Sequence, residues 1–125
     1  MATDTRPSVR IVEEVTSWPG VVAERGDRGE LSLRVGRREI GHLHGDRAAH
    51  FGFPKDVWQE LHDQGRIDHH PVFPGRAGPG ARRIEGDEDV RDVITLMRLN
   101  YDRVVARYGV GPRPGGADDG GRQPG

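Results

Sequence analysis

Residues 21–53 constrain the fold more strongly than any other part of the chain. They contain four short segments separated by turn sequences, at 21–25, 30–35, 38–44 and 48–53. Apolar and polar residues alternate in these segments, most clearly at 31–35, which predicts strands with one buried face. Strands joined by such short turns pair antiparallel. We therefore expect an antiparallel sheet with helices packed on one face, because each strand must bury its apolar side.

Three helices and two further strands complete the predicted order, α-β-β-β-β-α-β-β-α. These elements are helices at 8–18, 55–65 and 88–107 and strands at 67–73 and 81–85. Ser8 and Asp87 are suitable N-caps for the first and last helices, and Gly65 for the C-terminal end of the second. The predicted fold class is α+β, in a single domain over residues 7–108.

Composition limits both the size of the domain and its partners. A chain of 125 residues is long enough for one domain only, and residues 109–125 are rich in Gly and Pro. This tail offers nothing to bury, so we expect it to be disordered. The formal net charge is −1, with acidic and basic residues interspersed. Such a charge pattern lacks the basic face of a nucleic-acid-binding protein.

Several other classes of site are excluded by residue type. The chain has no cysteine, so it has neither disulfides nor a zinc site that uses Cys. No apolar run approaches the about 20 residues of a membrane-spanning helix, and the first residues lack the apolar core of a signal peptide. We expect a cytoplasmic protein with neither a nucleic acid nor a membrane as partner. The sequence leaves the oligomeric state open.

The histidines form the most informative pattern for function. Side chains alternate along a strand, so His42 and His44 point to the same face, roughly 7 Å apart. If residues 45–47 form a three-residue hairpin loop, His50 lies directly across from His42 on that face. Glu39 is expected to point to the opposite face. Three imidazoles would then crowd one patch of the sheet.

Three interpretations of this patch remain open. It is a solvent-facing polar surface, or a Zn or Fe(II) site formed by the three histidines, or an acid/base site. In the last case, close histidines disfavour one another's protonation and leave a neutral imidazole to take a proton from an enol or phenol. We treat His62, on the second predicted helix, as a surface residue.

The stretch "GRREIGHLHG", followed by "HFGFP", "DHHPVFPG" and a long final helix, resembles the luciferase-domain family. That family includes the luciferase of luminous fungi and many short bacterial proteins. The resemblance runs from about residue 21 to residue 108. One departure is the stretch "GPGARRIEG", which has no aromatic residue where family members commonly have a tryptophan.

The resemblance implies an oxygenase that needs no cofactor and uses O2 as co-substrate. The fungal members oxidise a hydroxylated styryl-pyrone and emit light. By position, it implies the catalytic residues Glu39, His42, His44, His50 and His70. To these we add candidates for binding a small aromatic substrate, namely Arg38, His69, Phe51, Phe53 and Trp58. Either His69 or His70 faces the site, and we expect Glu39 to pair with Arg37 or Arg38.

The alternative is a non-catalytic domain that binds a small molecule or a divalent metal through the same histidines.

Overall fold

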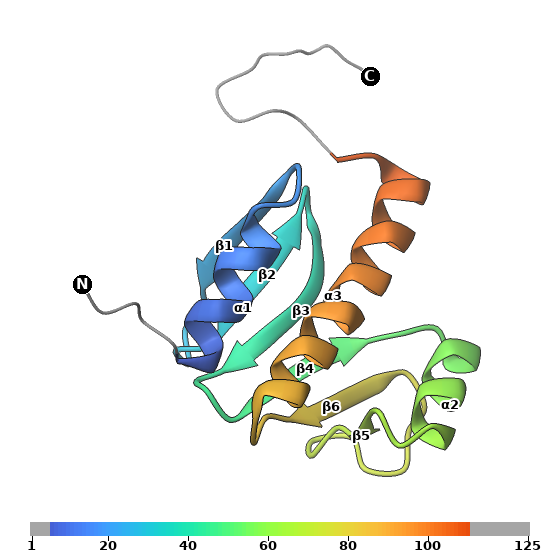
Figure 1. The fold of residues 1–125 in the computed structure, drawn as a ribbon. Coiled ribbons are helices and arrows are strands. Elements are labelled where there is room, and N and C mark those ends of the chain that lie inside the picture. Colours follow the sequence, from blue (N-terminus) through green and yellow to red (C-terminus); the bar gives the residue numbers. More distant parts are fainter. Residues whose placement is uncertain (1–5, 111–125) are drawn as a thin grey trace.

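The structure, a computed structural model that describes residues 6–110, contains one six-stranded antiparallel sheet and three α-helices within that range (Figure 1). Along the chain the elements are α1 (Pro7–Thr16), β1 (Val21–Arg25), β2 (Leu31–Val35), β3 (Arg38–His44), β4 (Ala48–Gly52), α2 (Lys55–Asp63), β5 (Asp68–His69), β6 (Pro79–Arg83) and α3 (Asp87–Tyr108). The strands lie in the order β1-β2-β3-β4-β6-β5. The predicted α+β class and element order are confirmed.

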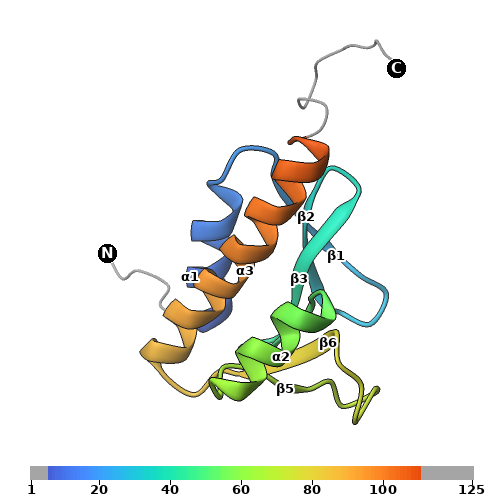
Figure 2. The same ribbon diagram turned by 90° about the vertical axis from the view of Figure 1, so that its right-hand side faces the viewer.

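The helices pack on one face of the sheet, as predicted. Helices α1 and α3 lie side by side, with α1 against β1 and β2 and α3 against β2, β3 and β6 (Figure 1). Figure 2 shows α2 near β5 and β6, where the indole Nε1 of Trp58 donates to the carbonyl of Pro79 at 2.9 Å. No helix in residues 6–110 has the length and apolar character needed to cross a membrane.

The β3–β4 hairpin has the register that the sequence predicts. His44 pairs with Ala48 and His42 pairs with His50, which leaves residues 45–47 as the loop. Gly45 has a φ of 58°, a left-handed conformation that glycine adopts without steric cost. The short loop therefore places His50 opposite His42, on the face away from α1 and α3.

A β-bulge in β3 changes which side chains reach that outer face. Leu33 pairs with Gly41 and Arg34 pairs with Glu39, so Ile40 is the extra residue. Ile40 is fully buried, and a Cβ on Gly41 would lie 2.6 Å from the sulfur of Met97, so both positions face the helices. The alternation is thereby shifted by one residue, and Glu39 lies on the same face as His42. The expectation that Glu39 points away is wrong.

Asn100 of α3 holds this irregularity in place. Its side-chain Nδ2 donates to the carbonyl of Ile40 at 3.2 Å and to the carbonyl of Gly52 at 3.0 Å. Asn100 is only 2 % exposed, and a buried amide with partners is far less costly than one without. The bulge is thus connected directly to the longest helix.

The strand predicted at 67–73 is much shorter in the structure. Only Asp68 and His69 pair with β6, and β6 itself begins at Pro79 rather than at residue 81. Pro71 lacks the N–H that a longer ladder requires. The chain turns instead, with the N–H of Phe73 bonded to the carbonyl of His70 at 3.0 Å.

Two predicted helix caps are also wrong. Helix α1 begins at Pro7, and the N–H of Ser8 donates to the carboxylate of Asp46 at 2.8 Å, so the cap comes from the β3–β4 loop. The N-cap of α3 is Gly86, while Asp87 lies in the first turn and pairs with Arg10. Both helix starts are therefore stabilised by contacts between distant segments, which a local pattern does not show.

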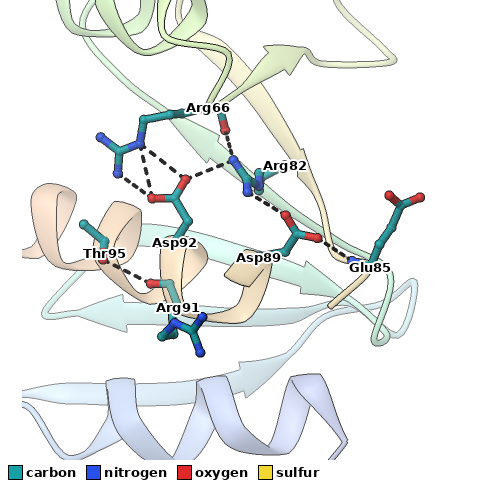
Figure 3. A network of polar contacts seen from close by, with 7 residues as sticks. All are labelled: Arg66, Arg82, Glu85, Asp89, Arg91, Asp92 and Thr95. Atoms are coloured by element: carbon teal, nitrogen blue, oxygen red, sulfur yellow. Dashed lines mark hydrogen bonds and ion pairs between the residues drawn. The ribbon is translucent and has the colours of Figure 1, made fainter. Parts of the chain in front are cut away.

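A network of ion pairs fixes the start of α3 to the strands below it (Figure 3). The guanidinium of Arg82 contacts Asp89 at 2.5 Å and Asp92 at 2.9 Å, and Arg66 contacts Asp92 at 2.6 Å. All four side chains are mostly buried. The network joins β6, the turn after α2 and α3, and so positions the short β5 and the turn that follows it.

Most of the predicted disordered tail, residues 111–125, lies outside the described residues. Within the described part, Gly109 ends α3 and Val110 packs against the core.

Candidate functional site

Four histidines from three segments meet on the outer face of the sheet. The ring centroids of His42 and His44 are 4.9 Å apart, those of His42 and His50 are 5.2 Å apart, and those of His44 and His50 are 4.3 Å apart. His70, from the turn after β5, lies 4.2 Å from His50. We call these four residues the histidine cluster. The three histidines that the sequence places on one face do converge there.

His69 and His70 lie in different surroundings although they are adjacent in the chain. His69 pairs with Gly80 of β6, and its ring lies 4.9 Å from Trp58 and 5.1 Å from His62. His70 is beyond the last paired residue and contacts His50 instead. Of the two, therefore, His70 belongs to the histidine cluster.

Glu39 and Ser32 orient the ring of His42. One carboxylate oxygen of Glu39 lies 3.0 Å from His42 Nδ1, and the other accepts a hydrogen bond from Ser32 Oγ at 2.6 Å. An ionised carboxylate only accepts, so Nδ1 of His42 bears the proton and Nε2 has a free lone pair. Glu39 thus partners His42 and Ser32, rather than the arginines that we expected.

His70 has the opposite tautomer. Its Nδ1 accepts a hydrogen bond from the backbone N–H of Val72 at 3.1 Å. A backbone N–H only donates, so Nδ1 of neutral His70 has no proton and Nε2 bears it. The cluster therefore presents a proton acceptor at His42 and a proton donor at His70.

The histidines of the cluster are held in the neutral form. Burial, followed by the charges of neighbouring histidines, lowers the pKa of His50 to about 4. The same two causes, in the same order, lower the pKa of His44 and of His70. The hydrogen bond from His42 is the largest cause that lowers the pKa of Glu39. Near neutral pH the site thus combines neutral imidazoles with one carboxylate.

Three of the four rings also have the geometry of a possible metal site. One nitrogen from each of His42, His44 and His50 can be chosen so that all three lie within 4.8 Å of one another. His50 Nδ1 is buried and has no hydrogen-bond partner within the described part of the chain. Imidazole nitrogen is a good ligand for zinc and for other divalent transition metals.

A groove of about 530 Å³ lies beside the cluster. Its apolar lining comes from Ala48, Pro71, Ala81 and Ile84, and its polar lining from Arg47, His50, Asp68, His69, Arg83 and Glu85. Pockets of this volume take drug-sized molecules. Because His50 lines the groove, a molecule bound there would have one end next to the cluster.

The other predicted substrate-binding residues lie elsewhere. Phe51 and Phe53 stack on each other at 5.4 Å and are buried in the core. Trp58 is also buried, and its ring stacks on His62, which is therefore more than a surface residue. Arg38 lies over the ring of Tyr108 at 3.9 Å. None of these side chains contacts the histidine cluster.

Sequence reasoning missed two residues of the site. Ser32 pairs with His42 across β2 and β3, and a correct register for this strand pair would have shown it. Phe73 lies 5.4 Å from His70, ring to ring, and is 40 % exposed. It is an aromatic residue beside the cluster, on the turn rather than on the strand where the family motif has one.

A family model described as Luciferase domain matches residues 37–100. The matched range includes the whole histidine cluster and Glu39. No curated protein and no solved structure has significant similarity to the chain.

Proposed function

The chain belongs to the luciferase-domain family, and on that premise we propose that it is a small oxygenase that needs no cofactor. Its substrate is an enolic or phenolic aromatic such as a hydroxylated styryl-pyrone, with O2 as co-substrate, and the product forms with or without light. We further propose that it acts in the cytoplasm, with neither a nucleic acid nor a membrane as partner. The family match supports the class of reaction, and the histidine cluster supports the chemistry.

The observation on which this proposal rests is the pair of opposite tautomers at His42 and His70. Glu39 holds the proton of His42 on Nδ1, so Nε2 is free to take a proton from a hydroxyl group. Val72 leaves the proton of His70 on Nε2, where it is available to stabilise the oxyanion that forms. A base and a hydrogen-bond donor thus face the same small region.

The reaction then needs no further redox group from the protein. The enol or phenol loses its proton to His42, and the resulting anion donates electron density from its ring carbon to O2, forming a C–O bond. The substrate supplies the electrons, and protonated His42 returns a proton to the reduced oxygen. The low pKa of His50 keeps a second positive charge away from protonated His42.

The groove beside His50 supports a substrate with an extended apolar part. Ala48, Ala81 and Ile84 provide a smooth apolar surface for a flat ring, and the exposed ring of Phe73 is close enough to His70 to cover it. The reacting hydroxyl would then lie at the cluster and the rest of the molecule along the groove.

The test measures O2 uptake and light from chelator-treated protein given 3-hydroxyhispidin, alongside His42→Ala and His44→Ala. Uptake by the wild type that is largely lost in His42→Ala supports the proposal. Equal rates in the wild type and His42→Ala contradict the assignment of the base.

No uptake by the wild type overturns the oxygenase. In that case, binding of the same molecule without turnover would favour the alternative of a non-catalytic small-molecule-binding domain.

A further inference from the structure

We propose that the histidine cluster is also a Zn2+ site, with His42, His44 and His50 as ligands, and that bound metal switches off the base. The three chosen nitrogens lie within 4.8 Å of one another. In a tetrahedral site with Zn–N bonds of 2.0–2.1 Å, ligand nitrogens are about 3.3 Å apart. The rings therefore need to approach by only a little over an ångström.

The freedom for this approach is in His44. Its side chain is exposed and lies at the end of β3, next to the loop, so its ring can move without disturbing the core. His42 and His50 are held more firmly, because their residues pair directly across β3 and β4. The result is two fixed ligands and one adjustable ligand.

The surroundings of the fixed ligands are those of a metal site. Glu39 accepts from His42 Nδ1 at 3.0 Å and is itself held by Ser32, so Nε2 of His42 is free for the ion. A carboxylate behind a ligating histidine is the usual arrangement for orienting the ring. His50 Nδ1 is a buried nitrogen without a partner, and a bound ion would supply one.

The ligand set favours zinc over the harder cations. All three ligands are imidazoles, whereas Mg2+ and Ca2+ prefer oxygen. Three protein ligands leave a fourth tetrahedral position for water or for an oxyanion. His70 keeps its proton on Nε2 and so remains outside the ligand set.

Metal and proton would compete for the same lone pair. Once Nε2 of His42 is bound to Zn2+, it cannot take a proton from the substrate. The inhibitory effect rests on the proposed function, whereas the metal site itself does not. Free Zn2+ is therefore expected to inhibit, and a chelator to restore, the reaction.

The chain has its own control for non-specific metal binding. His62 and His69 are also near each other, with ring centroids 5.1 Å apart, but they lie beside Trp58 and away from the cluster. A variant with both changed to Ala retains the proposed site. His44→Ala, by contrast, removes one ligand at an exposed position where loss of folding is not expected.

The experiment titrates the chelator-treated full chain with Co2+ and then Zn2+ and records the visible absorption of tetrahedral Co2+. We expect one Co2+ per chain, displacement by Zn2+, and loss of the signal in His44→Ala but not in His62→Ala/His69→Ala. Glu39→Gln is expected to weaken binding by about ten- to a hundredfold.

The outcomes separate this inference from the proposed function. An absence of the tetrahedral signal, or a signal that His44→Ala leaves unchanged, overturns the metal site and leaves the oxygenase untouched. A signal together with O2 uptake that Zn2+ reduces supports both proposals. A signal together with uptake that appears only when metal is present supports the site but overturns inhibition and the cofactor-free reaction.

Discussion

The chain contains two groups of histidines that differ in what surrounds them. In the histidine cluster, four rings pack against one another and His42 is bound to a carboxylate. In the second group, His62 stacks on the indole of Trp58 at 4.7 Å and His69 lies beside both. The first arrangement defines where protons lie, and the second adds packing around an aromatic ring.

The contrast shows that chemistry depends on the partner of each ring rather than on the number of histidines. "DHH" divides between the two groups, because Asp68 and His69 pair with β6 while His70 lies beyond the last pair. One residue along the chain changes the surroundings from an indole to another imidazole. The predictions below test this division.

The largest effect is expected from replacing the adjacent histidines one at a time. His70→Ala removes the Nε2–H donor, and loss of one such donor lowers kcat by about 10²–10³-fold in enzymes that stabilise an oxyanion. His69→Ala is expected to leave kcat within about twofold, because its ring contacts Trp58 and His62 only. Steady-state O2 uptake measures both.

Similar losses in the two variants would mean that His69 also contacts the reacting atoms, and the division between the two groups would fail. The free energy of unfolding of each variant serves as the control, so that a loss of activity is not confused with loss of folded protein.

The second prediction concerns acid stability. The pKa of His50 is lowered to about 4, by burial first and by neighbouring histidines second, against an ordinary value of about 6.5. Between these two pH values the unfolded chain binds a proton at His50 and the folded chain does not. The free energy of unfolding is therefore highest above pH 6.5 and falls as pH decreases towards 4, by at most about 3 kcal/mol from this residue.

Urea unfolding between pH 7 and pH 4.5 measures this effect. His50→Leu is expected to flatten the dependence on pH, because the residue that gains a proton on unfolding is gone. His69→Leu, the matched change in the second group, is expected to keep the slope of the wild type. A slope as steep in His50→Leu as in the wild type would show that other groups cause the acid sensitivity.

The sequence predicted the part of the site that depends on local geometry. The alternation of side chains and the length of the 45–47 loop were sufficient to place His50 opposite His42. Both follow from the period of a strand and from the register of a short hairpin. The fold class followed in the same way, from the run of short strands.

The remaining features depend on contacts between distant residues. The bulge at Ile40 reverses the side on which Glu39 lies, and it is supported by Asn100, 60 residues later. Without the bulge, neither the carboxylate behind His42 nor the role of Ser32 can be inferred. The short β5 similarly follows from where Pro71 ends the pairing with β6.

The smallest effect is expected in the second group. The rings of His62 and Trp58 are nearly parallel, at an interplanar angle of 10°, and such a contact contributes about 0.5–1.5 kcal/mol. His62→Ala is expected to lower the free energy of unfolding by that amount and to alter the fluorescence of Trp58, with O2 uptake unchanged. His69→Ala, whose ring is tilted by 46° to the indole, is expected to cost less. If His62→Ala instead reduced uptake while the folded fraction stayed constant, the second group would have a part in the reaction, and its histidines could not be treated as packing alone.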